Sequence, residues 1–548
     1  LKRAEKMLKF QAINFWGSIP YLILALFVLP VIIIISSLFG EWSENWSHIY
    51  NFVLFDYVSN SILLVMGVTV LVFIIGVGSA WIITNYKFFG KNTLEWALIL
   101  PLSVPPYILA YTFTGLFDTY GTANNLLRDL FNLQSDYAFF PNIRNIYGAI
   151  IVFSFTLYPY VYLVSRSAFL NQSQAMIEAA RLLGLNKIQV FFKLAVPIKS
   201  PAIIGGIMLV SMETLSDFGA VDHFAIQTFT TGIFRTWYGM YDINTAMQLA
   251  SMLLLFVGLF LILERYSRNN AIYTSKSSTF RPIKLTELQG HRGGLAFLIC
   301  FLPVFIGFIL PILELSFWAF ERNLNFFDYK FLSTTQNTII LAITAGILCS
   351  IFALLVNYSI RFNKDNFSRH AGSILSLGYA VPGLILAVGI VQLFTWLDAT
   401  VFITSEVVLT GSLIGLIFAY IVKSYALANS SIESGYERIS SSIDDSARVL
   451  KSTGFDMLKR IHFPLLKTSF LTSTLLVISE VTKELPATLI LRPFNFDTLA
   501  VSTYIYAAEE RMMQASAPAI AIVMVGLIPI IILTKMIRTS RPGKRDYE

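Results

Sequence analysis

Four carboxylates lie inside otherwise apolar stretches, in two pairs with the same spacing. Glu213 and Asp217 are four residues apart, and Glu480 and Glu484 repeat that spacing 267 positions later. Four residues is about one helical turn, so each pair occupies one face of a helix. A carboxylate within a bilayer costs roughly 2.5–3.5 kcal/mol, so each should face water or a partner. Oxygen donors placed in this way would attract a hard cation along a translocation path.

A structural role is the alternative for these acids, which could cap or bridge helices near the outer surface with Lys483 or Arg235 as partner. The sequence offers little other chemistry. The five histidines are scattered and lack metal-ligand spacing. There is no G-x-x-x-x-G-K-[ST] phosphate loop and no Ser-His-Asp or Cys-His arrangement. We therefore expect no enzymatic activity, no bound cofactor and no tightly bound metal in this chain.

A second pattern could act on a partner protein, because a polar segment occurs twice in this lipophilic chain. Its first copy comprises Glu178, Ala179, Ala180, Arg181, Gly184 and Pro197. Its second copy comprises Asp445, Ser446, Ala447, Arg448 and Pro464, again at an offset of 267. Gly184 suits a helix C-cap and Asn186 a following N-cap, which predicts two short helices joined by a turn.

An apolar ridge should follow each turn, made of Ile188, Phe191 and Phe192 in the first copy. Phe455, Leu458 and Ile461 are its counterparts in the second copy. Each segment could simply pack on the ends of its own helices. The equal spacing of the two copies instead favours docking of a symmetric partner.

The composition identifies the elements that must position these residues as membrane helices. Hydrophobic residues make up 55% of the 548 positions and charged residues 13%, too few to cover a soluble protein. Apolar runs long enough to cross the bilayer predict about twelve spans. They lie near 19–39, 58–84, 94–117, 147–165, 200–218, 244–264, 295–317, 336–360, 371–396, 412–430, 468–490 and 515–537.

The basic residues indicate how the chain is oriented. Most of the 40 Lys and Arg residues fall on one side of the predicted spans. The positive-inside rule then places both termini and both polar segments in the cytoplasm. The net charge of +7 is thus an orientation signal, and we expect the lipid bilayer rather than nucleic acid as a partner. The apolar stretch after residues 1–18 is too long for a cleavable signal peptide and reads as the first membrane helix.

An internal duplication organises the spans. Asn60-Ser61-Ile62 matches Asn337-Thr338-Ile339 at an offset of 277, and from Gly148 onward the offset is 267. The difference of ten residues falls in the outer loop after the third span. We predict a first half over 1–264 with a cytoplasmic loop at 166–199, a linker over 265–294, and a second half over 295–548 with a loop at 431–467. Two parallel six-helix repeats would be related by a pseudo-two-fold axis along the membrane normal.

The repeated pattern of acid, small residue, Ala, Arg and a distant Pro resembles the cytoplasmic loop of permeases of binding-protein-dependent ABC importers. The segments at 211–219, 228–232 and 483–493 resemble those of the fused ferric-iron permeases of this class. The resemblance implies an all-α type I importer fold, in which each loop forms a coupling helix that docks on an ATPase. The second loop departs from the pattern at Asp445, Ser446 and Lys451, so we predict that the two loops dock unequally.

The resemblance also implies the partners and the location. It implies two copies of a cytoplasmic ATPase that use ATP and Mg, and a periplasmic binding protein that delivers ferric iron. The location would be a bacterial inner membrane. Fused permeases for thiamine, polyamines or phosphonates share this layout, so another small solute is the alternative. An ion-coupled secondary transporter is a further alternative, but it would give the cytoplasmic repeats no purpose.

Overall fold

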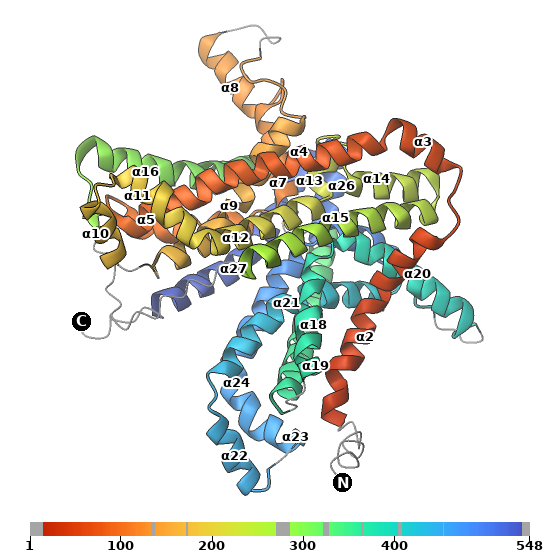
Figure 1. Cartoon of the computed structure of the whole chain (residues 1–548). Helices are drawn as coiled ribbons and strands as arrows, with labels where there is room; N and C mark the ends of the chain where they lie inside the picture. The colour runs from red at the N-terminus through yellow and green to blue at the C-terminus, as the bar shows by residue number, and fades with distance from the viewer. Residues whose placement is uncertain are drawn as a thin grey trace. The chain divides into compact units, whose positions relative to one another are not determined.

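The chain folds into helices throughout the part that the computed structural model describes, residues 15–132, 138–170, 172, 174–269, 285–321, 328–362, 366–403, 408–452 and 454–539 (Figure 1). Within these ranges the strands are β1 (Tyr86–Lys87) and β2 (Thr286–Glu287), which pair in parallel. Eleven helices are long and apolar enough to cross a membrane, or twelve if one bent pair counts as a span. A helix satisfies its own backbone hydrogen bonds, as a chain in lipid requires. The predicted all-α membrane fold is confirmed.

Two of the expected spans are broken rather than continuous. The span expected at 94–117 consists of α6 (Lys91–Ala97) and α7 (Pro106–Phe117), and the bend at this break is 92°. The span expected at 371–396 consists of α19 (Asn366–Leu375) and α20 (Gly383–Thr400). Prolines at 105, 106 and 382 stand at the breaks, where they disfavour helix in the preceding residue and cannot donate a backbone hydrogen bond. Both expected spans are therefore interrupted at these prolines.

The bounds of the helices repeat with the offsets that the duplication predicts. Helix α9 (Ile146–Leu170) and helix α21 (Leu413–Glu437) have the same length, at an offset of 267. Helices α12 (Val196–Ser216) and α24 (Phe463–Thr482) begin at the same offset, and so do α13 (Gly219–His223) and α25 (Pro486–Leu491). Helices α7 and α20 begin 277 residues apart. Helix α8 (Thr122–Phe131) lies between α7 and α9, where the offset changes.

The helices pack into two compact units that differ from the two halves of the sequence. The first unit combines the chain up to Gly40 with Leu332–Thr498, and the second combines Glu41–Phe331 with Leu499–Glu548. The first helix among the described residues, α2 (Phe15–Ser36), therefore packs with helices of the second half. The halves at 1–264 and 295–548 remain a prediction about the repeat, while the units describe which helices bury one another.

In the first unit, α2 packs against α19 and α20, and α21 packs against α24 (Figure 1). Phe27 of α2 makes an edge-to-face contact with Tyr425 of α21, with ring centroids 5.6 Å apart. Gly389 of α20 lets α2 approach closely, because an added methyl group would lie 2.7 Å from the Pro30 carbonyl oxygen. This unit also contains α18 (Tyr329–Phe362), α22 (Ser441–Val449), α23 (Gly454–Met457) and α25.

In the second unit, α9 lies at the centre and packs against α4 (Leu54–Val72), α5 (Gly78–Asn85) and α12. Buried hydroxyls on these helices donate to the carbonyl one turn earlier, as Thr156 does to Val152 at 2.8 Å. The remaining elements are α3 (Asn45–Phe52), α10 (Gln174–Leu182), α11 (Lys187–Val190), α14 (Phe229–Phe234), α15 (Ile243–Asn269), α16 (Gly290–Val304), α17 (Leu310–Glu321), α26 (Leu499–Ala508) and α27 (Met512–Thr539).

Candidate functional site

The two polar segments fold into the same succession of elements, each within its own unit. In the first, α10 ends in a turn, α11 follows, and a π-helical turn over Phe191–Ala195 leads into α12. In the second, α22, α23 and a π-helical turn over Leu458–His462 lead into α24. Both π-helical turns begin and end at an offset of 267. Pro197 and Pro464 are the second residues of α12 and α24, directly after the π-helical turns.

The turn after each first helix is closed by the same three backbone hydrogen bonds. Residues 183, 184 and 185 donate to the carbonyls of 179, 181 and 180 at 2.9–3.2 Å. Residues 450, 451 and 452 donate to 446, 448 and 447 at 3.0–3.1 Å. Gly184 has φ 84° and Lys451 has φ 62°, so both take the left-handed conformation of a helix C-cap. Lys451 keeps the geometry of Gly184 at a cost of roughly 1–2 kcal/mol.

In the first segment, the second short helix, α11, begins as the sequence predicts. Asn186 Oδ1 accepts from the backbone N–H of Gln189 at 2.8 Å, and Gln189 Oε1 accepts from the backbone N–H of Asn186 at 3.0 Å. This reciprocal pair is a capping box, which satisfies two backbone donors at the start of α11.

The predicted acid and Arg residues of the first segment point outward. Glu178, Ala179 and Arg181 are exposed, and the Glu178 carboxylate accepts from Gln174 Nε2 at 3.0 Å. Ala180 is buried instead, in a small core with Ile177 and Val190. In that core a small side chain lets α10 approach α11 closely.

The second segment repeats this division between an outer and an inner face. Asp445, Ser446 and Arg448 are exposed and Ala447 is buried. Arg448 lies 5.2 Å from the centre of the Phe362 ring, a cation–π contact, and 3.8 Å from Asp445. Ala447 therefore takes the packing position that Ala180 holds in the first segment.

Large apolar side chains are exposed at equivalent positions of both segments, and we name each set an apolar tip. The first apolar tip is Leu182, Leu183 and Ile188, which are 89%, 84% and 70% exposed. The second apolar tip is Val449, Leu450 and Phe455, which are 82%, 81% and 65% exposed, each at an offset of 267. Apolar patches outside a membrane mark contacts with other proteins. The sequence reasoning named Ile188 and Phe455 but missed the other four.

The predicted ridge is wrong in part, because one of its members is buried and another is half-buried. Leu458 belongs to the hydrophobic core of the first unit. Phe191 turns toward Trp81, with ring centroids 5.2 Å apart. The helical period alone could not show that the ridge is split by the π-helical turns. The repeat offset would have identified the tips, since Leu182 and Leu183 recur as Val449 and Leu450.

A buried charged cluster distinguishes the second segment from the first. Asp444 Oδ2 accepts from Arg361 Nε at 2.7 Å, and Asp444 Oδ1 lies 3.1 Å from His462 Nε2. Arg361 also donates to the backbone carbonyls of Tyr436 and Ile439 at 3.0 and 2.8 Å. At the corresponding offsets the first segment has Thr84, Ile177 and Ala195 in place of Arg361, Asp444 and His462. One segment is thus anchored by apolar packing and the other by buried charges.

Two of the membrane carboxylates cap short helices. Asp217 Oδ1 accepts from the backbone N–H of Ala220 at 2.8 Å, at the start of α13. Glu484 accepts from the backbone N–H groups of Ala487 and Thr488 at 3.2 and 3.1 Å, at the start of α25. The negative charge at a helix N-terminus is favourable in both cases. Asp217 and Glu484 therefore have the same role at the same repeat position.

The other acids are placed on the membrane helices. Glu480 pairs with Lys483 at 2.9 Å, and Glu484 is 3.3 Å from Lys423 Nζ. Glu213 is half-buried on α12. The capping and bridging roles, which the sequence left as the alternative, thus describe Asp217, Glu480 and Glu484. A place for these acids along a translocation path stays a prediction.

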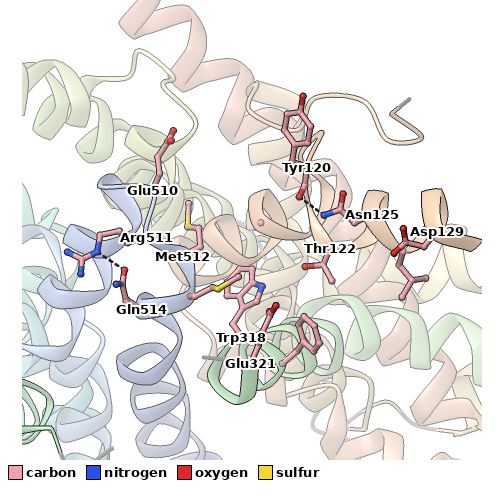
Figure 2. Close-up of a pocket in the computed structure, with 14 residues that line it drawn as sticks. Tyr120, Thr122, Asn125, Asp129, Trp318, Glu321, Glu510, Arg511, Met512 and Gln514 are labelled. Carbon is pink, nitrogen blue, oxygen red and sulfur yellow. Dashed lines mark hydrogen bonds between the residues drawn. The ribbon is translucent and has the colours of Figure 1, made fainter. Parts of the chain in front are cut away.

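A cavity of about 810 Å³ opens in the second unit between the turn that precedes α8, the end of α17 and the turn between α26 and α27 (Figure 2). Its lining includes the carboxylates Asp129, Glu321 and Glu510 and the guanidinium group of Arg511. Arg511 Nε donates to Gln514 at 2.6 Å, which holds it to its own helix. Among the residues that the structure describes, no three His, Cys, Asp or Glu side chains come together as a metal site.

The sequence of the chain is similar to those of known transport permeases. Residues 72–266 match the family described as binding-protein-dependent transport system inner membrane component. The chain is similar to the Fe(3+)-transport system permease protein FbpB 2 of Haemophilus influenzae, with 25% identity over 88% of this chain and 90% of that relative. It is 24% identical to the ferric transport system permease protein FbpB of Actinobacillus pleuropneumoniae, over 79% of this chain and 64% of that relative. The sulfate transport system permease protein CysT of Salmonella typhimurium is 26% identical but covers 33% of this chain.

Proposed function

We propose that this chain is the permease of an importer and carries ferric iron across the inner membrane. It belongs to the inner-membrane components of binding-protein-dependent transport systems. These components span the membrane many times and are not themselves ATPases. Permeases of this class work with an ABC ATPase and a binding protein. We infer that two copies of a cytoplasmic ATPase bind the two polar segments, and that a periplasmic binding protein delivers the iron. Both termini would then lie in the cytoplasm, as the distribution of basic residues indicates.

The single observation that carries the proposed role as an ATPase-driven permease is the pair of apolar tips. Six large apolar side chains are exposed at equivalent positions of two segments that the positive-inside rule places in the cytoplasm. Lipid cannot cover these side chains in the cytoplasm, whereas a binding groove on a soluble partner would bury them. A helix that lays apolar side chains into a groove is a common mode of recognition. Two equivalent tips require two equivalent grooves, which two copies of one ATPase provide.

The coupling mechanism follows from how rigidly each tip is attached to its membrane helices. Each π-helical turn continues directly into a membrane helix, α12 in one segment and α24 in the other. A displacement of a tip by the ATPase is therefore transmitted to that helix rather than absorbed by a flexible loop. ATP binding would favour one separation of the two tips over another, and so shift the permease between two conformations.

Iron as the substrate rests on the relatives and not on a site. The two ferric relatives extend over 88% and 79% of this chain, whereas the sulfate relative covers 33%. A molybdenum transport permease, ModB of Haemophilus influenzae, covers 26%. The two ferric relatives align with both halves of this chain, as expected if they share its fused architecture. This favours ferric iron over sulfate and molybdenum as the substrate.

Docking is tested with the variant Leu183→Ser/Leu450→Ser, which removes one exposed leucine from each apolar tip. A central interface side chain contributes about 2 kcal/mol, so each site should lose affinity by ~30-fold. The ATPase is expected to dissociate from the purified variant complex. The control is Leu130→Ser, since Leu130 is 68% exposed on α8, on the opposite side of the membrane in the proposed topology. Retention of the ATPase by the double variant at the wild-type level would contradict the proposal.

A further inference from the structure

Two phenols, a carboxylate and an imidazole gather in the second unit from three helices that are distant in sequence. Tyr504 of α26 donates its hydroxyl to Asp222 Oδ2 of α13 at 2.9 Å. His223, next to Asp222, makes an edge-to-face contact with Tyr111 of α7, with ring centroids 4.7 Å apart. The hydroxyl oxygen of Thr114, one turn after Tyr111 on α7, lies 2.9 Å from the Nε2 atom of His223. Asp222, His223 and Tyr504 are half-buried.

The Tyr111 hydroxyl is a buried polar group with no hydrogen-bond partner among the described residues. Its side chain is 3% exposed, and it lies within electrostatic reach of Asp222, Asp217 and Tyr504. Leaving a buried hydroxyl unpaired is unfavourable, so such a group needs an explanation. A bound ligand that the hydroxyl contacts would supply one.

We propose that Tyr111, Asp222, His223 and Tyr504 form a transient binding site for the ferric ion on its way through the permease. This inference rests on the proposed function. Phenolate and carboxylate oxygens are hard donors, which suit a small trivalent cation. Two phenolates and one carboxylate carry three negative charges, which balance the charge of Fe³⁺.

Binding at this site is a ligand exchange without a change of oxidation state. Each phenol that binds the ion forms an Fe–O bond and releases its proton to water. The hydrogen bond from Tyr504 to Asp222 breaks in this step, which frees the carboxylate oxygen for the metal. The Nε2 atom of His223 faces Thr114, which leaves Nδ1 as the ring nitrogen available to the ion.

The surroundings of the cluster favour release as well as binding. Arg235 lies within electrostatic reach of Asp222, and Arg144 within reach of His223, so cations oppose the bound ion. Conduction requires sites that bind well enough to admit an ion but weakly enough to let it leave. The cluster is not repeated in the other half, where Leu489 and Ile490 stand at the offset of 267 from Asp222 and His223. The proposed site is therefore single rather than one of a pair.

The site is tested by titrating the purified permease–ATPase complex with ferric citrate and recording visible spectra. Iron bound by a phenolate gives a charge-transfer band that iron bound by carboxylates alone does not. We expect the band in the wild type, and its loss or a shift in Tyr504→Phe and Tyr111→Phe, with affinity lowered by about tenfold or more. The matched control is Tyr158→Phe, because the Tyr158 hydroxyl is also buried and unpartnered but has no carboxylate or imidazole contact among the described residues.

A wild-type complex without the band, or a band that persists unchanged in Tyr504→Phe and Tyr111→Phe, would overturn the site. Failure of the proposed function is separable from this outcome. If reconstituted wild-type complex imports iron but the tyrosine variants import it equally well, the site is wrong and the importer stands. If the wild-type complex imports another solute and no iron, the proposed substrate itself is wrong.

Discussion

The charged cluster beneath the second apolar tip gives a sharp prediction about how the two segments differ. In the variant Asp444→Ile, the second segment acquires the residue that the first segment has at 177. The Arg361 guanidinium then stays buried without its carboxylate, at a site where it now makes a hydrogen bond of 2.7 Å. Removing one partner of a buried ion pair costs about 3–5 kcal/mol. Arg361 retains its carbonyl partners at Tyr436 and Ile439, so we expect the lower end, about 3 kcal/mol.

The assay is native-state hydrogen exchange of the peptide that covers α22. A loss of about 3 kcal/mol raises the equilibrium constant for local opening by ~150-fold, and exchange should accelerate by that factor. The triple variant Asp444→Ile/Arg361→Met/His462→Leu replaces all three charged-cluster residues by apolar residues, with Arg361 and His462 replaced at similar volume. It should recover most of the protection, because replacing a whole buried ion cluster by packed apolar groups is often neutral.

Two results would refute this reasoning. The first is wild-type protection in Asp444→Ile, which would show that Arg361 does not depend on the carboxylate. The second is a triple variant no more protected than the single variant, which would show that the loss arises from something other than an unpaired charge.

Two further predictions concern the backbone turn and an outer loop. Gly184→Ala should destabilise the first segment by about 1 kcal/mol, because an added methyl group meets no atom within 4 Å and only the left-handed backbone is penalised. Lys451→Gly should slow hydrogen exchange in the second segment. A slower exchange in Gly184→Ala, or a faster exchange in Lys451→Gly, would contradict the shared turn. Burial would raise the pKa of Asp242, but hydrogen bonds from Ser43, Thr245 and Asn45 outweigh it and lower the pKa to about 2. A lowered pKa stabilises the fold above the unfolded value of 3.8 and ceases to do so as the pH falls toward 2. Thermal unfolding should therefore show the wild type more stable than Asp242→Asn at pH 6, by a margin that shrinks below about pH 4.

The local features of the polar segments were predictable because their causes lie within a few residues. Gly184 takes a left-handed conformation and Asn186 caps a helix, as their residue types suggest. The repeat added what one copy could not, since Lys451 would not be read as a C-cap without its offset from Gly184. That offset imposes the same turn on a residue that disfavours it.

The long-range contacts were not predictable, because nothing in the sequence pairs their partners. Glu484 pairs with Lys423, a residue 61 positions away. Tyr504 and Asp222 are 282 positions apart, and no spacing rule connects them. The placement of α2 with helices of the second half is likewise a consequence of packing rather than of pattern. Hydropathy gave the spans but could not show which unit buries each one.

The most direct test of the central claim is uptake of radioactive iron by vesicles that contain the chain, its ATPase and its binding protein. The account predicts accumulation that requires ATP, that persists in Leu130→Ser and that is lost in Leu183→Ser/Leu450→Ser. It also predicts that sulfate and molybdate do not accumulate under the same conditions. Iron uptake that survives the double substitution, or accumulation of either anion in place of iron, would contradict it.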